Sequence, residues 1–354
     1  MLTMEKPIRL DDYRTPELEQ SPPRTKQRHP TLLIAIVNTR EADMTIQCLR
    51  SLDAEMKLIP GMMVSVADNN SGDGSEEKLR AEMERLGWGE RGRVVQVGRN
   101  GGFSVGNNAA LRPMYRSDTP PDYYFLLNPD TIAQPGSFQT LLDFMEAHPE
   151  IGLAGSRCVY PNGQLQLSSF RFHSFFSEMD NAFRLGLLSK LLKKWAVVVP
   201  LPDTPTEFDW IGGAAFMFRK SVVDKIGLLD EGYFVYYEET DYCLRAKRAG
   251  FSSWYVPQSK IIHIEGQSTG VSDRKKAPKR RARYWFESRR RYFELNHGRF
   301  YSLFTDIGWV IGFSSFKVRQ FIQRKPNNDP PHFLWDFIRF NFFSRKPHHR
   351  SSLD

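Results

Sequence analysis

Short apolar segments alternate with helical patterns through the first third of the chain. Apolar runs suited to buried strands cover residues 31–37, 62–67, 94–97 and 123–127, and helical patterns cover 42–52 and 75–86. Strands that alternate with helices are typical of βαβ units and of a mostly parallel sheet. The pattern therefore predicts an α/β fold, with a Rossmann-like sheet that carries helices on both faces.

The rest of the chain is less regular. We expect a strand at 216–219, a helix at 239–249 that Gly250 ends, and a strand at 251–256 that Pro257 ends. Residues 1–30 are polar and proline-containing, which is typical of a disordered arm. After about residue 272 the sequence becomes basic and aromatic. These changes predict an arm at 1–30, an α/β domain at 31–271 and a helical extension at 272–354.

Polar residues follow each of the first four predicted strands. In chain order they are Asn38, Asp68, Arg99-Asn100 and Asn128-Pro129-Asp130. In open α/β sheets, ligands bind outside the carboxyl ends of the strands. Four polar strand ends in succession therefore predict a binding site on this rim.

The Asn128-Pro129-Asp130 turn puts a carboxylate where a buried strand reaches the surface. Such a carboxylate is a hard oxygen ligand for Mg²⁺ or Mn²⁺, which bind few protein groups and complete their shell with water and phosphates. Pro129 fixes its own φ and biases Asn128 towards an extended conformation. On this tripeptide alone, a capping role for Asp130 is the simpler alternative.

Two other segments are suited to a nucleotide. Asp68 could accept hydrogen bonds from a pyrimidine or a ribose, although the Asn and Ser residues after it also favour any tight turn. The glycine-rich stretch 99–108 could bring backbone amides and a helix N-terminus close to a phosphate. Its spacing matches neither a P-loop nor a dinucleotide fingerprint.

An acidic cluster and a histidine are the remaining candidates for chemistry. Glu238, Glu239 and Asp241 repel one another, which tends to raise a pKa towards the range of a general base. A solvated acidic helix start is the alternative. His263 follows a strand and could hold a metal, or could be an ordinary buried histidine.

Charge and cysteine content narrow the setting. The net charge of the 354 residues is +8, and basic residues gather after residue 270 in Arg274-Lys275-Lys276, Lys279-Arg280-Arg281 and Arg289-Arg290-Arg291. We expect these to form a basic face for an anionic partner such as nucleic acid, acidic lipid or a phosphorylated substrate. The three cysteines have no metal-ligand spacing, which favours a reducing compartment.

No signal-peptide pattern and no apolar run near the roughly 20 residues of a spanning helix is visible. We therefore expect a cytoplasmic protein that could rest on the inner face of the cell membrane. Trp, Phe and Tyr in 306–316 and 333–343 suit a membrane interface, or equally helices packed on the α/β domain.

Taken together and in order, these segments resemble the family 2 glycosyltransferases of the GT-A fold. The likeness is greatest to the rhamnosyltransferase-like branch of bacterial polysaccharide biosynthesis. It covers about residues 31–270 through "VADNNSGDGS", "GRNGGFSVGNNAAL", "FLLNPDT", "DWIGGA", "YYEETDYCLRAKRAGF" and "HIEGQSTG". The resemblance implies an inverting transfer of a sugar, such as rhamnose, from a dTDP- or UDP-sugar donor to a hydroxyl of a saccharide or lipid-linked acceptor.

The resemblance also implies roles for individual residues. Contacts to the nucleotide-sugar fall to Asn38, Asp68, Asn70, Arg99, Asn100, Gly102, Asn107 and Asn128. Asp130 and His263 would bind a divalent Mg²⁺ or Mn²⁺ ion, and Trp210, Gly212 and Gly213 would line the sugar and acceptor pocket. Two positions depart from the family pattern. Asn128 stands where the first Asp of the metal motif is usual, and Glu238-Glu239 replaces a Glu-Asp pair, so Glu239 and Asp241 both remain candidates for the base.

Two rival functions come from other classes. A nucleotidyltransferase on the same fold would want a glycine-rich, basic loop after the first strand, and "IVNTREADMT" does not supply one. A non-catalytic module that binds membrane or nucleic acid through its basic tail would leave Asp130 and the acidic cluster unexplained. For the glycosyltransferase we expect no nucleic-acid partner.

Overall fold

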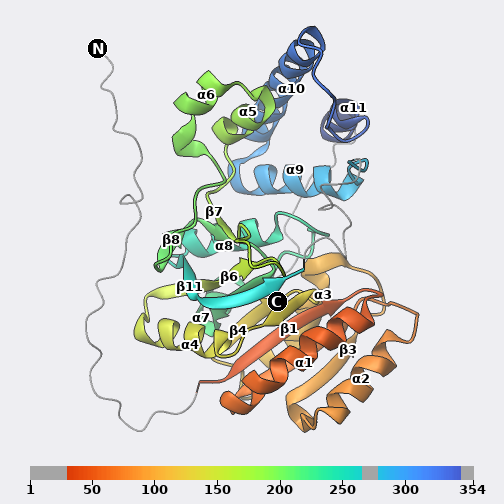
Figure 1. The fold of residues 1–354 in the computed structure, drawn as a ribbon, viewed down its shortest axis with the longest axis vertical. Coiled ribbons are helices and arrows are strands. Elements are labelled where there is room, and N and C mark those ends of the chain that lie inside the picture. The colour runs from red at the N-terminus through yellow and green to blue at the C-terminus, as the bar shows by residue number, and fades with distance from the viewer. Residues whose placement is uncertain (1–29, 265–277, 344–354) are drawn as a thin grey trace.

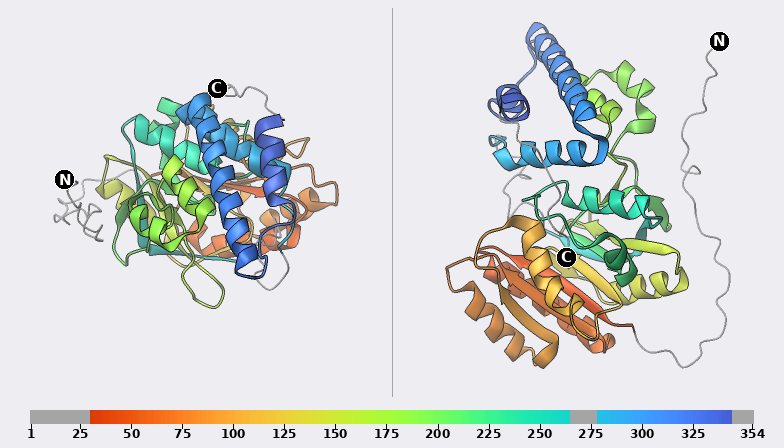
Figure 2. Two further views of the ribbon diagram at one scale, coloured as in Figure 1. Left: turned by 90° about the horizontal axis from the view of Figure 1, so that it is seen from above. Right: turned by 180° about the vertical axis from the view of Figure 1, so that it is seen from behind.

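The computed structural model describes residues 30–264 and 278–343 (Figure 1). Within them, a nine-stranded mixed sheet has the strand order β3-β2-β1-β4-β10-β6-β11-β5, with β8 beside β11. A unit of helices stands at one end of the molecule's long axis, beyond the sheet (Figures 1 and 2). The predicted arm at 1–30 falls almost wholly outside the described residues.

The first half of the sheet is parallel. Strands β1 (Leu32–Asn38), β2 (Met62–Asp68), β3 (Gly92–Gln96) and β4 (Tyr123–Leu127) pair in register, and Asn38 lies opposite Asp68. They are linked by α1 (Ala42–Leu58), α2 (Ser75–Arg85), the short turn η2 (Gly89–Arg91) and α3 (Gly102–Tyr115). The predicted parallel α/β arrangement is confirmed.

Side chains of β1 alternate between two cores, one on each face of the sheet. Leu32, Ile34 and Ile36 pack with α1, α2 and α4 (Ser137–Ala147). Leu33 and Ala35 pack with α3, α7 (Lys220–Ile226) and α8 (Glu238–Arg248) on the opposite face. This alternation is the period-two geometry of a strand buried on both sides.

The second half of the sheet is mixed. β10 (Ala215–Arg219) runs antiparallel between β4 and β6 (Ile151–Val159), and β11 (Ser252–His263) pairs with β6, with β5 (Thr131–Ala133) and with β8 (Thr206–Phe208). A small second sheet joins β7 (Ser169–Phe170) to β9 (Trp210–Ile211). Because β10 is antiparallel to β4, the residues just before β10 lie at the carboxyl end of β4.

The expected end of a strand at Pro257 is wrong. β11 continues to His263, because its pairing with β6 jumps from Val256–Ser156 to Lys260–Arg157. Pro257 lies in this irregularity, where the missing N–H of proline costs no ladder hydrogen bond. The continuation carries His263 to the rim of the sheet, opposite Thr131 of β5.

The helical unit combines two distant parts of the chain. It contains α5 (Phe175–Phe183), α6 (Gly186–Leu191) and η3 (Lys193–Trp195) together with α9 (Arg283–His297), α10 (Arg299–Ile322), α11 (Phe333–Ile338) and η4 (Arg339–Phe343). α5 packs closely on α10, where a Cβ on Gly308 would lie 2.8 Å from Met179. The boundary at residue 272 remains a prediction, and helices from both sides of it share this unit.

The expectation that Arg289, Arg290 and Arg291 form part of a basic face is wrong. All three are buried, because α9 is covered on several sides. Arg289 forms ion pairs with Glu178 of α5 and Asp306 of α10, and Arg291 pairs with Asp230. Of the other basic clusters, Arg274-Lys275-Lys276 lies outside the described residues.

Candidate functional site

The carboxyl ends of β1 and β2 form a polar network at the rim. Asn38 donates through Nδ2 to Oδ1 of Asp68 (2.7 Å), and the Ser71 amide donates to Oδ2 of Asp68 (3.0 Å). The Asn38 oxygen accepts from Thr45 (2.8 Å). The parallel register of β1 and β2 brings Asn38 and Asp68 together, as the strand-end pattern predicts.

Asp68 is held as a carboxylate. Burial would raise its pKa, but hydrogen bonds from Ser71, Asn38 and Gln96 outweigh burial and hold the pKa below its usual range. Gln96 ends β3 and was not identified from the sequence, where nothing but its position at a strand end pointed to it. A fixed, charged acceptor at this place is suited to the N–H and O–H donors of a nucleoside.

The glycine-rich loop is fastened between two parts of the rim. Asn69 donates to the Gly102 carbonyl (3.0 Å), and the Gly102 amide donates to Oδ1 of Asn100 (3.1 Å). The Phe103 amide donates to the carbonyl of Phe234 (2.7 Å). The loop therefore connects the Asp68 turn to the segment that precedes α8. Asn69 was also missed, because its turn-forming neighbours give the same sequence signal.

The other nucleotide candidates differ in their exposure. Arg99 and Asn100 are exposed on the loop, at the N-terminal end of α3. Asn70 has a positive φ of 57° in the turn after β2. Asn107 is buried in α3, and its amide donates to the Phe103 carbonyl (3.0 Å). For all four, contact with a nucleotide remains a prediction.

Asp130 and His263 face each other at the end of β4. His263 Nε2 lies 3.3 Å from Oδ1 of Asp130 and 3.5 Å from Nδ2 of Asn128. Asp130 is 2% exposed, and its Oδ1 receives no hydrogen bond from the described residues. On the other side of the imidazole, Nδ1 lies 2.9 Å from Oε1 of Gln166.

These groups fit a divalent metal of the Mg²⁺ or Mn²⁺ type. If Gln166 Oε1 accepts from Nδ1–H, then Nε2 presents its lone pair beside the unbonded Asp130 oxygen, which is the usual way a second group orients a ligating histidine. No cluster of three or more His, Cys, Asp or Glu side chains suited to a metal occurs among the described residues. A metal here would therefore rely on Asp130 and His263, with other ligands from water and phosphate.

The register of β10 brings the acidic cluster to the same rim. Ala215 pairs with Leu127, and the Asn128 amide donates to the Ala214 carbonyl (2.9 Å), so Gly213 follows opposite Pro129. A Cβ on Gly213 would lie 3.6 Å from Oε1 of Glu239. Glu239 thus reaches the end of β4 across a glycine.

An unusual backbone conformation sets the direction in which α8 begins. Tyr236 and Tyr237 have positive φ values of 74° and 68°, which side chains other than those of Gly, Asn and Asp seldom adopt. Burial, and then the charge of Glu239, raises the pKa of Glu238 well above its usual value. Burial also raises the pKa of Glu239, although a hydrogen bond from the Gly213 amide opposes this effect. One oxygen of each glutamate, Oε2, is buried without a hydrogen-bond partner among the described residues.

Asp241 is placed differently from the two glutamates. It is fully buried where α8 meets α9, and it accepts from Arg245 (2.8 Å), from Asn296 of α9 (2.7 Å) and from Tyr233 (3.3 Å). Arg245 in turn donates to the carbonyls of Ile226 and Leu228. The structure thus brings Glu239 to the strand-end rim and places Asp241 in the contact between two helices.

The predicted pocket residue Trp210 lies on β9 of the small sheet, and Gly212 directly follows that strand. Trp210 stacks on Phe170 with ring centroids 4.4 Å apart, and its indole N–H donates to the Arg171 carbonyl. His173 lies 6.1 Å from Trp210 and 4.9 Å from Tyr237, ring to ring. The Gly212 amide donates to the Ser168 carbonyl (2.9 Å). An aromatic group therefore adjoins the start of α8.

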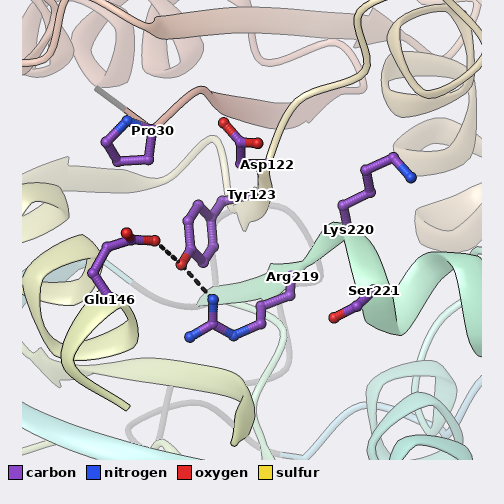
Figure 3. A pocket seen from close by; sticks show the side chains of 7 residues that line it. All are labelled: Pro30, Asp122, Tyr123, Glu146, Arg219, Lys220 and Ser221. Atoms are coloured by element: carbon purple, nitrogen blue, oxygen red, sulfur yellow. Dashed lines mark hydrogen bonds between the residues drawn. The ribbon is translucent and has the colours of Figure 1, made fainter. Parts of the chain in front are cut away.

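A separate pocket of about 310 Å³ lies at the opposite end of the strands, beside the start of β4 (Figure 3). It is lined by Tyr123, at the start of β4, and by Arg219, at the end of β10. The Arg219 guanidinium is already bonded to Tyr123 and to the carbonyls of Ile151 and Met145. This pocket is remote from the polar strand ends and is not part of the candidate site.

Comparison with known proteins decides the class of the site. The family described as "Glycosyltransferase like family 2" matches residues 29–284. The chain belongs to this family. The glycosyltransferase function that the motifs predict is therefore confirmed at the level of the family. The matched region includes every residue proposed for the site and ends just after α9 begins.

Two curated relatives of this glycosyltransferase are rhamnosyltransferases. The N-acetylglucosaminyl-diphospho-decaprenol L-rhamnosyltransferase of Mycobacterium tuberculosis is 28% identical over 221 residues, which cover 58% of this chain and 68% of that protein. Rhamnosyltransferase WbbL of Escherichia coli is 28% identical over 166 residues, which cover 46% of this chain and 60% of WbbL.

Solved structures show the fold. A Pyrobaculum calidifontis mannosyltransferase, in complex with GDP-Man and Mn²⁺, has a TM-score of 0.52 at 12% identity and covers 85% of this chain and 76% of its own. GalNAc-T7, with UDP, GalNAc and Mn²⁺, has a TM-score of 0.53 at 13% identity and covers 89% and 55%. The predicted GT-A fold is confirmed.

Proposed function

We propose that this glycosyltransferase transfers a sugar from a nucleoside-diphosphate donor to a hydroxyl, with inversion, using Glu239 as general base and a divalent metal held by Asp130 and His263. The observation that carries the proposal is the β4–β10 register. It sets Glu239, across Gly213, against the strand end that carries Asp130. A base and a metal-binding carboxylate on facing sides of one rim are what inverting transfer from a metal-bound diphosphate requires.

The donor's nucleoside belongs at the β1–β2 end. Asp68, Asn38 and Ser71 are bonded into one network there, and the exposed loop with Arg99 and Asn100 adjoins it. Backbone amides at the start of α3 suit the diphosphate. We propose a dTDP- or UDP-sugar, because the relatives named above are rhamnosyltransferases and a carboxylate suits a pyrimidine's N–H. Rhamnose is the first sugar to test.

Asp130 and His263 would hold the metal, which when bound supplies positive charge to the leaving diphosphate. One side chain of this chain keeps the histidine ligand in place, and a second lies beside it. Gln166 orients the His263 ring, and Asn128 lies within 3.5 Å of the imidazole nitrogen that would bind. The Mn²⁺ in both solved structures named above favours the same ion type here.

Glu239 would receive the acceptor's proton. As the acceptor oxygen forms its bond to the anomeric carbon, the bond from that carbon to the diphosphate oxygen breaks, and the nucleoside diphosphate leaves with the bonding electron pair. The raised pKa of Glu239 makes it a stronger base than an exposed carboxylate. Burial and the charge of Glu239 also raise the pKa of the neighbouring Glu238.

The acceptor is proposed to be a saccharide hydroxyl on a lipid-linked carrier. The M. tuberculosis relative is named for an N-acetylglucosaminyl-diphospho-decaprenol acceptor. Trp210, Phe170 and His173 form an aromatic group beside α8, and aromatic faces suit the apolar faces of sugars. Such an acceptor implies work at a membrane surface, on its cytoplasmic side. No helix among the described residues combines the length and apolarity needed to cross a bilayer.

A donor panel tests this function. dTDP-rhamnose and UDP-sugars are incubated with the full chain, Mn²⁺ and a short-chain polyprenyl-diphospho-N-acetylglucosamine, and released nucleoside diphosphate is measured. We expect release from one donor that depends on the acceptor and is lost in Glu239→Gln. Release that persists in Glu239→Gln would exclude this residue as base. An absence of release from every donor would reject the proposed substrates.

A further inference from the structure

The outer face of α10 carries an exposed apolar row. Its members are Phe300, Phe304, Ile307, Ile311, Val318 and Phe321, spaced by three, four or seven residues, so that they share one side of the helix. Phe300 is 92% and Phe321 is 85% exposed. The helix has 24 residues and a length of about 36 Å, so the row is long. The row is interrupted by Ser314 and Ser315, but an apolar surface of this length on a soluble protein usually marks a binding site.

From sequence, the aromatic residues of 306–316 and 333–343 suit either a membrane interface or helices packed on the α/β domain. Trp309 and Phe313 of the segment 306–316, and Phe337 of 333–343, are buried in a stack between α10 and α11. The opposite side of α10 therefore packs into the core of the helical unit. The exposed row is what remains for an outside partner.

α6 and the turn that follows it lie at the same end of the molecule as α10 (Figure 1) and carry further exposed apolar side chains. Leu187 and Leu191 of α6 are each 70% exposed. The next turn carries Trp195, which has the ammonium of Lys194 4.3 Å from its ring centroid. A ring at the surface under a lysine is typical of groups that lie at a lipid–water interface.

Positive charge predominates on this surface, where the half-buried Asp180 of α5 accepts from Ser189 of α6. The segment from Gly186 to Trp195 contains Lys190, Lys193 and Lys194 and no carboxylate side chain. The one carboxylate of α10, Asp306, is buried in its ion pair with Arg289. The exposed Arg324 and Lys325 follow the end of α10. Two copies of such a surface would repel each other, whereas an anionic bilayer attracts it.

We infer that the α10–α6 face is the surface by which this protein docks on an anionic lipid bilayer, with the apolar row of α10 inserted among the lipid headgroups. The inference rests on the proposed function in that a lipid-linked acceptor gives such docking its purpose. The helical unit contacts the segment that precedes α8 directly. Ser288 of α9 donates to the Val235 carbonyl, and Arg291 pairs with Asp230. Docking through α10 therefore holds the rim of the sheet at a fixed distance from the bilayer.

Vesicle binding tests the inference without donor, acceptor or metal. The full chain is sedimented with phosphatidylcholine vesicles, with and without phosphatidylglycerol, and the fraction bound is measured. The test variant is Ile311→Glu on α10, and the matched control is Leu58→Glu at the end of α1. These two side chains are equally exposed, at 59% and 58%. Light scattering without vesicles reports the oligomeric state.

We expect the wild type and Leu58→Glu to bind phosphatidylglycerol vesicles alike, and Ile311→Glu to bind at least about tenfold more weakly. Lys193→Glu/Lys194→Glu should lose the preference for phosphatidylglycerol. Unchanged binding of Ile311→Glu, or equal loss in Leu58→Glu, would overturn the inference. So would a dimer that Ile311→Glu dissociates while vesicles stay unbound. Turnover of a water-soluble acceptor should stay within about twofold in Ile311→Glu, which separates this result from any failure of the proposed chemistry.

Discussion

Gly102 lies directly under the carbonyl of Phe234. A Cβ at Gly102 would stand 2.0 Å from that oxygen, and the φ of Gly102 is +77°. Both facts require glycine, since the left-handed region costs other residues about 1–2 kcal/mol and the contact leaves no space. This contact locks the glycine-rich loop against the segment that leads to Glu238 and Glu239.

Gly102→Ala should therefore destabilise the fold and also reduce turnover. Gly98→Ala is the matched control, because Gly98 has a φ of +76° with nothing within 4 Å of the added Cβ. We expect urea unfolding to show a loss of about 1 kcal/mol for Gly98→Ala and clearly more for Gly102→Ala. Equal losses would mean that the Phe234 contact contributes nothing beyond backbone strain.

Glu239→Gln should separate chemistry from binding. Removal of a general base typically lowers kcat by about 10²–10⁴-fold. Binding of dTDP or UDP, measured by calorimetry, should change little, because the nucleoside network around Asp68 lies on other strands. Asp241→Asn is the comparison, and there we expect a loss of stability through its Arg245 and Asn296 bonds. A Glu239→Gln enzyme with wild-type kcat would exclude the base assignment.

Asp130→Asn should weaken the dependence of donor binding on metal. Asp130 offers a buried oxygen without a hydrogen bond, and an amide replaces that negative charge by a neutral group. We expect the Mn²⁺ concentration for half-maximal nucleotide binding to rise at least about tenfold. Removal of divalent metal with a chelator should lower wild-type turnover by a similar factor.

The exposed Asp118 provides a control for this experiment. Asp118→Asn carries the same chemical change away from the rim and should titrate with Mn²⁺ as the wild type does. If Asp130→Asn and Asp118→Asn gave the same titration, Asp130 would not be a metal ligand.

Glu178 should make stability depend on pH in the acid range. Burial alone would raise its pKa, but the charge of Arg289 and the nearby imidazole of His173, whose Nδ1 lies 3.5 Å from Oε1, lower it to about 2. Because the folded pKa is depressed, the contribution is complete above the ordinary value of 4.5 and is lost as the pH falls from there towards 2. The shift corresponds to roughly 3 kcal/mol.

In Glu178→Gln this contribution is absent at every pH. Urea unfolding between about pH 7 and pH 3 should therefore show a flatter decline of the unfolding free energy for the variant than for the wild type. Glu150→Gln, which changes an exposed carboxylate, should follow the wild type. Parallel wild-type and Glu178→Gln curves would contradict the role of the Arg289 pair.

Much of the fold was accessible from sequence, for a physical reason. The parallel strands are buried on both faces, so they read as continuous apolar runs, and the predicted 123–127 strand is β4 without change. The strand after residue 250 was cut short, because Pro257 gives the same signal at a strand end as in an irregularity within a strand. The pairing with another strand decides whether a proline ends a strand or lies within one, and the local sequence does not show which strand that is.

The site was only partly accessible. Glu239 and Asp241 are two residues apart on α8, so their side chains leave the helix on different sides and only one can face a given site. Which one does so depends on β10 and α9. Three further side chains support the site through contacts between residues far apart in the sequence, which no local motif predicts. They are Gln166, Gln96 and Asn69.

The run Arg289-Arg290-Arg291 shows the same limit for charge. Successive helical residues point about 100° apart, so a solvated arginine run is expected unless the helix is surrounded. Here Arg289 reaches α5 and α10, Arg290 donates to the Phe340 carbonyl, and Arg291 reaches Asp230. Sequence shows the charges but not the four partners that neutralise or bind them, which are Glu178, Asp306, the Phe340 carbonyl and Asp230.

The family match stops at residue 284, while α9 runs on to His297. A polypeptide shortened to that border would retain Glu239, Asp130 and His263 but would deprive Asp241 of Asn296 and Asp230 of Arg291. The helix α8, which carries Glu239, would then lose its packing and hydrogen bond with the end of α9. A shortened form of this enzyme for crystal growth or gene fusion should therefore end beyond α9, because the matched region alone leaves out Asn296 and Arg291.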